Sequence, residues 1–479
     1  MNIALVYPDI SIRERYGADI GEIGGRQAPL GVLYLSSFLK KKSHNVIVID
    51  AAAENLDNNE IIRRIIKHDA KLVGISSTSV ALQNSKILAK NLKSELNVRT
   101  VIGGPHISSN PDDISKLNEF DFGIIGEGEL SLANLAEKIQ ENSNDFSEVP
   151  NLIWRRGEEV VRNERIQYIE NLDILPFPDR DALTDIELYR PPIGCYLREP
   201  VVSIITSRGC PYQCIFCDKS VFGNKIRFFS SEYVISEIEM IIRKYKAREL
   251  AFVDDTFPCN RKRFIEILES IIRKNFKIRW SCMSNANDLN EDIIMLMKKA
   301  GCWQIAIGIE SGDDEILKKI KKKTNTEQIR RIVTFAHKLN IFVKGFFMIG
   351  HPGEDMKSIE KTKKFALSIP LTDITYTIAT PIKGSEFYNM AISGKFGYFE
   401  NVKPSELNYW KPIFIPKNLN KEILLKKQKE FFKDFYLRPQ ILYRQILKIR
   451  SIKNLIRFIR TAIKIVFIAL QQGNFENNQ

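Results

Sequence analysis

The feature that most constrains the fold of this chain is a regular alternation of short apolar segments with amphipathic ones. It occurs in two runs, over residues 1–145 and again from residue 200, and a segment rich in Pro, Asp and Arg separates them. Apolar segments of about four to eight residues bounded by turn residues are typical of buried strands, and longer segments of helical period are typical of helices. The alternation therefore predicts an α/β protein with parallel sheets in two domains.

The first run predicts a doubly wound parallel sheet over residues 1–145. Its expected strands are Ile3–Tyr7, Val46–Asp50, Leu72–Ser76, Arg99–Ile102 and Phe122–Ile125. Its expected helices are Leu30–Lys41, Glu60–Ile66, Leu82–Leu96 and Leu130–Ile139. Loops at the carboxyl ends of such strands form a crevice for ligands, so binding residues are expected there.

The second run predicts six strand–helix units over residues 200–400, which resemble a partial (βα)6 TIM barrel. The expected strands are Val202–Thr206, Leu250–Asp254, Arg279–Met283, Gln304–Ile309, Val343–Ile349 and Ile374–Ala379. The expected helices are Glu232–Tyr245, Lys262–Lys274, Asn290–Ala300, Glu327–Leu339 and Met356–Leu367. Four polar residues fit as helix N-caps, namely Ser231, Asn260, Asn290 and Thr326.

Two regions lack the alternation. Residues 146–199 carry the motif Leu175-Pro176-Phe177-Pro178-Asp179-Arg180, and proline at this density breaks both helix and strand. A linker laid across a domain surface is expected there. Residues 401–479 are expected to form a helical C-terminal region, in which Gln440–Leu470 alternates Ile, Leu and Phe with Arg and Lys at helical spacing.

This basic tail has two interpretations. No acidic residue lies between Phe435 and Phe475, so much of the net charge of +13 is concentrated here, and a nucleic-acid-binding surface is not expected. A basic amphipathic helix can make peripheral membrane contact through residues 440–470. The sequence favours the other interpretation, in which the helix caps the barrel and its basic face is solvated.

The cellular compartment is expected to be the cytoplasm. The segment Met1–Ile10 lacks the features of a secretory signal, and no uncharged stretch is long enough to span a membrane. Seven cysteines in such a chain indicate metal or redox use in a reducing compartment. Four of them are expected to be buried small hydrophobes, namely Cys195, Cys259, Cys282 and Cys302.

The other three cysteines, Cys210, Cys214 and Cys217, stand directly after the first strand of the second run at the spacing C-x3-C-x2-C. Three thiolates on one loop can bind three irons of a cubane cluster. A structural zinc site would need a fourth ligand at similar spacing, and the next cysteine is Cys259. The triplet therefore predicts an iron–sulfur cluster with one open iron.

The segment from Cys210 to Cys217, with an aromatic residue before the last cysteine, resembles the radical S-adenosylmethionine (SAM) superfamily. The resemblance implies a [4Fe–4S] cluster, with SAM chelating the open iron and Phe216 beside its adenine. It also implies reductive cleavage of SAM to a 5′-deoxyadenosyl radical, with electrons from an external donor such as flavodoxin or ferredoxin.

Segments at the ends of later strands resemble the SAM-binding segments of the same superfamily. Asp254 and Asp255 stand where many relatives carry a Gly-Gly-Glu motif for the SAM amino group, so one of them is assigned this role by position alone. Glu310 and Ser311, in Gly-Ile-Glu-Ser-Gly, match a segment that faces the ribose and methionine. Gly345 begins the fifth segment, whose glycines allow close approach of the backbone.

The first run resembles the flavodoxin-like cobalamin-binding domain of one radical SAM subfamily. The matching motifs are Pro29–Leu35, Gly74–Thr78, Ile102–His106, Gly126–Glu129 and the Leu-Pro-Phe-Pro-Asp-Arg linker. They imply cobalamin as a cofactor and the following contact residues: Ser76, Ser77, Thr78, Gly103, Gly104, His106, Glu127 and Gly128. The residues alone leave flavin or nucleotide binding open.

The cobalt ligand departs from the better-known pattern. Asp-x-His-x-x-Gly is absent, because the first strand runs into Tyr7-Pro8-Asp9-Ile10-Ser11-Ile12 without a histidine. The lower face of cobalt is therefore expected to lack a protein histidine, and His106 is the alternative ligand.

The combined resemblance implies a methyl transfer from methylcobalamin to an unactivated carbon or phosphorus centre of a small-molecule, lipid-like or natural-product substrate. A cyclase or rearrangement enzyme of the same architecture is the alternative, and a non-catalytic cobalamin or redox sensor is the weaker one. Methylthiotransferases place a second cluster on three N-terminal cysteines. No cysteine precedes Cys195, which argues strongly against that class.

Overall fold

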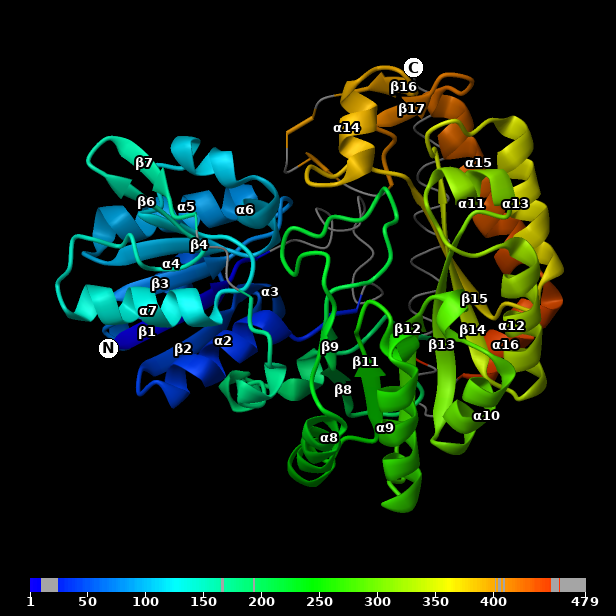
Figure 1. Cartoon of the computed structure of the whole chain (residues 1–479), viewed down its shortest axis with the longest axis horizontal. Helices are drawn as coiled ribbons and strands as arrows, with labels where there is room; N and C mark the ends of the chain where they lie inside the picture. Colours follow the sequence, from blue (N-terminus) through cyan, green and yellow to red (C-terminus); the bar gives the residue numbers. More distant parts are fainter. Residues whose placement is uncertain are drawn as a thin grey trace.

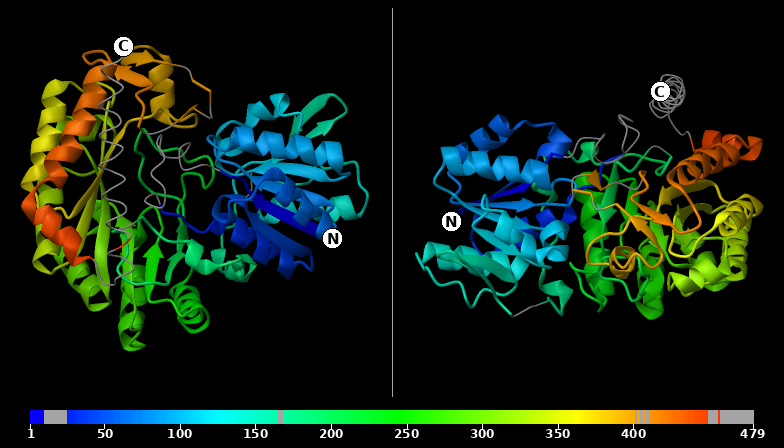
Figure 2. Two further views of the ribbon diagram at one scale, coloured as in Figure 1. Left: turned by 180° about the vertical axis from the view of Figure 1, so that it is seen from behind. Right: turned by 90° about the horizontal axis from the view of Figure 1, so that it is seen from above.

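The computed structural model describes residues 1–9, 25–164, 168–192, 194–400, 402–403, 406–407, 410–448 and 456. Within them the chain forms two α/β sheet domains that lie side by side (Figures 1 and 2). The first is coloured blue to cyan and the second green to yellow, and the orange to red helices of residues 421–447 lie on the side of the second domain away from the first. The predicted fold class is confirmed.

The first sheet has seven strands in the order β2-β1-β3-β4-β5-β6-β7. The first five are parallel and match the expected strands closely: β1 (Asn2–Tyr7), β2 (Asn45–Asp50), β3 (Leu72–Ser76), β4 (Arg99–Gly103) and β5 (Phe122–Ile124). The helices that connect and cover them are α2 (Leu30–Lys41), α3 (Ala51–Glu54), α4 (Asn58–Lys67), α5 (Leu82–Glu95), α6 (Pro105–Ser109) and α7 (Glu129–Gln140). Strands β1 and β3 lie inside the sheet, and most of their residues are buried, as expected of apolar strands covered on both faces.

Part of the segment expected to be a linker belongs to this sheet. Strand β6 (Leu152–Arg156) pairs antiparallel with β5, and β7 (Glu159–Arg162) pairs antiparallel with β6. No proline lies between Pro150 and Pro176, so nothing breaks these strands. The first sheet therefore extends beyond residue 145.

The rest of the linker crosses to the second domain. It contains three short 3-10 helices, Leu172–Ile174, Arg180–Ala182 and Ile186–Leu188. The Arg180 guanidinium lies 2.8 Å from the carboxylate of Glu237 on the first barrel helix, and both side chains are buried. This ion pair fastens the proline-rich motif against the second domain.

The second sheet is parallel and has the order β15-β14-β13-β12-β11-β8. Its strands follow the chain order of a partial barrel: β8 (Val201–Ile204), β11 (Glu249–Phe252), β12 (Arg279–Ser284), β13 (Cys302–Glu310), β14 (Phe342–Ile349) and β15 (Asp373–Ile378). The connecting helices are α8 (Ser231–Tyr245), α9 (Arg261–Arg273), α10 (Glu291–Lys299), α11 (Asp314–Lys319), α12 (Thr326–Lys338) and α13 (Met356–Ser368).

Side-chain caps begin these helices. Asn260 and Asn290 accept hydrogen bonds from the backbone N–H three residues on, as predicted. At the other two expected caps the structure uses the preceding residue: Ser230 caps α8 and Asn325 caps α12. Each of these residues is extended and can therefore aim its side chain back at the first turn, whereas Ser231 and Thr326 are already helical.

The C-terminal region contains α14 (Glu386–Ile392), the hairpin β16 (Gly397–Phe399) and β17 (Phe414–Pro416), α15 (Lys421–Tyr436) and α16 (Pro439–Leu447). Helix α16 packs on the barrel through Ile441, and Arg444 donates a hydrogen bond to the ring of His337. Leu447 stays 40% exposed. The remainder of the tail expected over residues 440–470 lies outside the described residues, apart from Ile456, so its membrane contact stays a prediction. In the described part of the chain, no helix has the length and apolarity to cross a bilayer.

Candidate active site

The cysteine triplet lies on the loop that follows the first barrel strand. After β8 the chain forms β9 (Ser207–Arg208), which pairs antiparallel with β10 (Arg227–Phe228), and the loop between them carries the cysteines. Gly209 has a φ of +94°, and a Cβ there would lie 2.9 Å from the carbonyl oxygen of Lys225. Only glycine fits this turn, which directs the chain from the strand into Cys210.

All three cysteines line one cavity of about 490 Å³ at the carboxyl ends of the barrel strands. Residues at or near the ends of later strands share this cavity with the triplet, as do Phe216 of the cysteine loop and Lys322 after α11: Asp255, Thr256, Met283, Asn285, Gly308, Glu310 and Phe346. Phe216 also lies near the buried ring of His351, with 6.0 Å between the ring centroids. The triplet and the later strand ends are therefore brought together, as the barrel interpretation predicts.

The thiols of the triplet are in different environments. A hydrogen bond with Cys217, assisted by the cation of Lys322, lowers the pKa of Cys214 to about 7. Burial raises the pKa of Cys210. Among the described residues no three His, Cys, Asp or Glu side chains converge on a single metal ion. A cubane does not require such convergence, because each cysteine ligates a different iron. Three thiols on one cavity wall therefore fit a cluster.

A buried ion pair lies beside the triplet. Lys322 Nζ is 3.0 Å from Glu310 Oε1, and each side chain is less than a tenth exposed. Burial acts to lower the pKa of Lys322, but the charges of Glu310 and Cys214 more than offset this and raise it. Gly308 makes room for the pair, because a Cβ there would lie 2.6 Å from Glu310 and 2.7 Å from Lys322.

Only one of the two neighbouring aspartates faces this cavity. Asp255 lines it, and burial raises the pKa of its carboxyl. Asp254 is fully buried elsewhere and accepts hydrogen bonds from the backbone N–H and hydroxyl of Thr206 and from Ser207. Of the two aspartates expected near the SAM amino group, only Asp255 therefore lines the cavity, whereas Asp254 supports the strand that leads to the cysteines.

Two further expected SAM contacts also lie away from the cavity. Ser311 is buried against Thr362, with 3.0 Å between the two hydroxyl oxygens. A Cβ on Gly345 would point toward Phe347, Ile309 and Leu371, on the helix-covered face of the sheet. The alternation of side chains along a strand explains this outcome, because Gly345 and the cavity-lining Phe346 point to opposite faces.

A polar network at the cavity was not expected from the sequence. The Tyr212 hydroxyl donates a hydrogen bond of 2.6 Å to Asp288, whose other oxygen accepts one from Thr256. Lys219, which follows the triplet, donates to the backbone carbonyl of Tyr212. The one sequence feature that could have indicated this network is the position of Tyr212, between two cysteines of the triplet.

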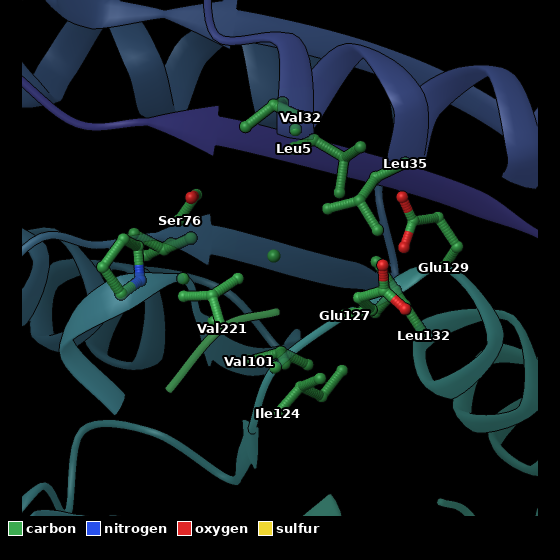
Figure 3. Close-up of a pocket in the computed structure, with 18 of the residues that line it drawn as sticks. Leu5, Val32, Leu35, Ser76, Val101, Ile124, Glu127, Glu129, Leu132 and Val221 are labelled. Carbon is green, nitrogen blue, oxygen red and sulfur yellow. The ribbon is translucent and has the colours of Figure 1, made fainter. Parts of the chain in front are cut away.

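A second cavity, of about 300 Å³, lies at the carboxyl ends of the strands of the first sheet (Figure 3). Its walls are mainly aliphatic, from Leu5, Val32, Leu35, Val101, Ile124 and Leu132. Six glycines complete them, and added Cβ atoms on two of these, Gly31 and Gly103, would meet nothing within 4 Å. The backbone therefore leaves space that side chains would fill, which fits a bulky ring or tail such as those of cobalamin.

The expected cobalamin contacts divide into two sets. Ser76, Gly103, Gly104, Glu127 and Gly128 line this cavity. Ser77 and Thr78 do not: the Ser77 backbone N–H donates to the carbonyl of Gly103, and the Thr78 hydroxyl accepts from the N–H of Ala81.

His106 is also absent from the cavity wall. It is fully buried, with one ring nitrogen 3.1 Å from the Ser79 hydroxyl and the other 3.4 Å from the Asp113 carboxylate. The proximity to His106 lowers the pKa of Asp113. His106 therefore holds α6 against the loop after β3, and it is not placed as a ligand of cobalt.

The two domains are joined at both ends of the cysteine loop. Before it, Arg208 contacts the carboxylates of Glu127 at 2.7 Å and Glu129 at 2.5 Å, and all three side chains are buried. After it, Asp218 accepts a hydrogen bond from Ser109 of α6. Arg227 also pairs with Glu127, at 2.6 Å. Glu127 therefore reaches the cavity wall as part of an interdomain ion cluster.

The two cavities have a common wall. Pro105 from the first domain, and Val221 and Phe222 from the loop after the triplet, line both of them. Figure 3 shows Val221 lying beside the aliphatic side chains of the first-domain cavity. A ligand in one cavity is therefore separated from a ligand in the other by a single layer of side chains.

Family models match both domains. The model of the Radical SAM superfamily covers residues 204–366, which include most of the cysteine cavity. The model of the B12 binding domain covers residues 17–136, which include most of the first-domain cavity. The cofactors that follow from these matches are a [4Fe–4S] cluster, SAM and cobalamin, so the expected cofactors are confirmed.

Relatives and solved structures agree with these matches. An uncharacterized methyltransferase of Pyrococcus horikoshii is 32% identical over 429 residues, which make up 88% of this chain and 91% of the relative. The anaerobic magnesium-protoporphyrin IX monomethyl ester cyclase of Rubrivivax gelatinosus is 24% identical over 451 residues, or 92% of this chain and 78% of the relative.

The structure of the radical SAM methyltransferase TsrM of Kitasatospora setae, with cobalamin and [4Fe–4S] cluster bound, has a TM-score of 0.69 at 16% identity. The match covers 94% of this chain and 89% of that one, and it shows that the folds are alike. The resemblance inferred from the motifs is thus confirmed. The chain belongs to the family of cobalamin-dependent radical SAM enzymes, which includes methyltransferases and the anaerobic cyclase.

Proposed function

We propose that this enzyme transfers a methyl group to an unactivated carbon or phosphorus centre of a small molecule. The observation that carries the proposal is the common wall of the two cavities, formed by Pro105, Val221 and Phe222. A substrate held at this wall would be within reach of both cofactor sites, which a reaction using a radical and a methyl carrier requires. The surrounding domains would also exclude water from the reacting groups.

When bound, the cluster supplies the electron that cleaves SAM, and cobalamin supplies the methyl carrier. Within this proposal, Cys210, Cys214 and Cys217 hold three irons and leave the fourth open to SAM. Phe216 packs beside the adenine. The Asp255 carboxylate faces the SAM amino group, and Glu310, held in place by Lys322, faces the ribose and methionine.

The cobalamin site is assigned to the residues that line the first-domain cavity. Gly103, Gly104 and Gly128 allow the backbone to approach the ligand, and Ser76 offers a hydroxyl. No histidine is among the described residues that line this cavity, and His106 is buried away from it, so we propose that no histidine of this chain would bind the cobalt of cobalamin. The aliphatic walls of the cavity would shield a bound cobalamin from solvent.

The cyclase relative keeps one alternative open, a radical reaction without methyl transfer. The protein loaded with both cofactors is given methyl-deuterated SAM and a chemical reductant without substrate. Methyl transfer predicts S-adenosylhomocysteine in an amount equal to the bound cobalamin, together with 5′-deoxyadenosine. A cyclase predicts 5′-deoxyadenosine alone, and this product pattern would reject the proposal.

A Gly103→Leu variant serves as the matched control for this experiment. Its side chain would fill the first-domain cavity and leave the cysteine cavity intact. It should therefore form 5′-deoxyadenosine but no S-adenosylhomocysteine. Equal amounts of S-adenosylhomocysteine from this variant would show that the methyl group does not pass through the cavity.

A further inference from the structure

A basic groove of about 550 Å³ opens beside the cysteine loop. We define it by the lysines of one short segment and by one residue of the cysteine loop, namely Lys318, Lys321, Lys322, Lys323 and Gln213. Asp314 is the acidic residue of the lining, and its carboxylate accepts hydrogen bonds from the N–H and hydroxyl of Thr326. The lining therefore carries a strong excess of positive charge.

The lysines of the basic groove differ in their partners. Lys322 is buried against Glu310, and Lys321 pairs with Glu386 at 2.6 Å. Lys318 and Lys323 are exposed, and within the part of the chain that the structure describes no acidic side chain pairs with either. Their charges remain available to a partner of opposite charge.

The basic groove lies directly against the cysteine loop. Gln213, between Cys210 and Cys214, is part of its lining. The backbone N–H of Ile215 donates a 3.1 Å hydrogen bond to the carbonyl of Ile320, within the lysine segment. Lys322 lines the groove and the cysteine cavity alike. A partner seated in the groove would therefore be separated from the cluster site by the cysteine loop and Lys322.

We propose that the basic groove is the docking surface for a small acidic protein that carries single electrons to the cluster. The inference rests on the proposed function, in which the cluster must be reduced before SAM is cleaved. One electron passes from the reduced carrier to the oxidised cluster, and the carrier leaves oxidised by one electron without any bond being made or broken.

The physical requirements of such a partner match the groove. Electron transfer slows steeply with distance, so the carrier must approach the cysteine loop closely. It must also dissociate after each electron, which suits a small contact steered by charge rather than an extensive apolar interface. Clustered lysines at this position supply long-range attraction, which salt screens over a Debye length of about 8 Å at physiological ionic strength.

The test uses full-length, cluster-loaded protein and a purified flavodoxin in its hydroquinone state. Cluster reduction is followed by absorbance in stopped-flow experiments, and binding of the oxidised flavodoxin is measured separately. The variant is Lys318→Glu with Lys323→Glu. The matched control is Lys90→Glu with Lys299→Glu, which makes the same charge change at two exposed lysines on α5 and at the far end of α10.

The groove variant should slow reduction by flavodoxin about tenfold or more at low salt, weaken binding, and lose most of the salt dependence. Reduction by dithionite, and SAM cleavage driven by it, should stay at the wild-type rate. Equal slowing in the control variant, or an unchanged rate with flavodoxin, would overturn the docking assignment. Slower reduction by dithionite would also overturn it, since the lysines would then act on the cluster itself.

A small anion is the competing occupant of the groove. Inorganic phosphate or citrate could bind the groove of the wild type while flavodoxin reduces the wild type and the groove variant at the same rate. In that case the surface is an anion site and the proposal is wrong. Failure of the proposed function is recognised separately, because the wild-type protein would then form no S-adenosylhomocysteine with dithionite, whatever its rate of reduction by flavodoxin.

Discussion

The guanidinium of Arg208 lies 2.7 Å from the carboxylate of Glu127, and this buried pair joins the strand before the cysteine loop to the first domain. Glu129 completes the contact at 2.5 Å. Removal of one partner of a buried pair leaves an uncompensated charge and costs about 3–5 kcal/mol. Arg208→Ala should therefore lower the free energy of unfolding by that amount, as measured by denaturant titration, and should weaken cobalamin binding.

The control for Arg208 is the exposed pair between Lys225 and Glu170, in which both side chains are about 70% exposed. Pairs of this kind are screened by solvent and contribute little to stability. Lys225→Ala should thus be nearly neutral in the same titration. If both variants lose the same free energy of unfolding, the buried interdomain cluster stabilises the protein no more than an exposed ion pair does.

The sequence anticipated the elements more closely than the contacts between them. The expected strand Val343–Ile349 is β14 (Phe342–Ile349), and the expected helix Leu30–Lys41 is α2 to the residue. These elements follow from apolar periodicity, which is local. The pair of Arg208 and Glu127 is separated by 81 positions, and no local pattern indicates that such residues meet.

Side-chain direction at the site could be predicted only in part. Asp254 and Asp255 are adjacent beyond the end of β11, where the alternation of the strand no longer fixes which side chain faces the cavity. Lys322 follows Glu310 by twelve residues in a lysine-rich segment, which by composition resembles a solvated surface. Lys322 can be buried because Gly308 has no Cβ that would clash with it. The sequence does not show that these two residues are neighbours in the folded structure.

The second prediction concerns the cysteines. Alanine at Cys210, Cys214 or Cys217 should abolish reductive cleavage of SAM and reduce bound iron, because all three lie on one cavity wall and share one cluster. Cys302 is fully buried beside Cys282 on the other side of the sheet, so Cys302→Ala should keep the wild-type iron content. Iron analysis after anaerobic reconstitution measures both. Wild-type cleavage by Cys214→Ala would contradict the cluster assignment.

The third prediction uses side-chain size at Gly103. Its added Cβ meets nothing within 4 Å and its φ is not positive, so larger residues are sterically tolerated by the protein itself. Each larger side chain should occupy more of the first-domain cavity. Cobalamin affinity should therefore decrease from Gly103 to Gly103→Ala to Gly103→Leu, with the thermal unfolding midpoint changed little. Affinity that is independent of size would place cobalamin elsewhere.

The fourth prediction separates the two aspartates. Asp255→Asn removes a carboxylate from the cysteine cavity and should weaken SAM binding, by about tenfold if one charged contact of about 1.4 kcal/mol is lost. Asp254→Asn alters a residue that accepts hydrogen bonds from Thr206 and Ser207, so it should destabilise the fold and leave SAM affinity unchanged in the folded fraction. Equilibrium binding and thermal unfolding distinguish them. Weaker SAM binding by Asp254→Asn, with unchanged SAM binding by Asp255→Asn, would indicate that Asp254 contacts SAM.

The last prediction concerns Glu354, a fully buried carboxyl after the fifth barrel strand. Burial raises its pKa from 4.5 to about 8, although the backbone N–H groups of Gly350 and His351 donate hydrogen bonds to it. In the folded state this carboxyl stays protonated at pH values where the unfolded chain is ionised. Its contribution to stability is therefore fully present below pH 4.5 and is lost as the pH rises toward 8.

Glu354→Gln removes this titration, so its stability relative to the wild type should increase between pH 5 and pH 8 by an amount on the order of a few kcal/mol. Other buried groups titrate in the same window, including Glu249 with a pKa raised to about 7 by burial, but they are common to both proteins and cancel in the difference. Denaturant titrations at several pH values measure that difference. The exposed Glu141→Gln is the control and should show none. A difference between Glu354→Gln and the wild type that is constant with pH would show that the Glu354 carboxyl titrates normally in the folded protein.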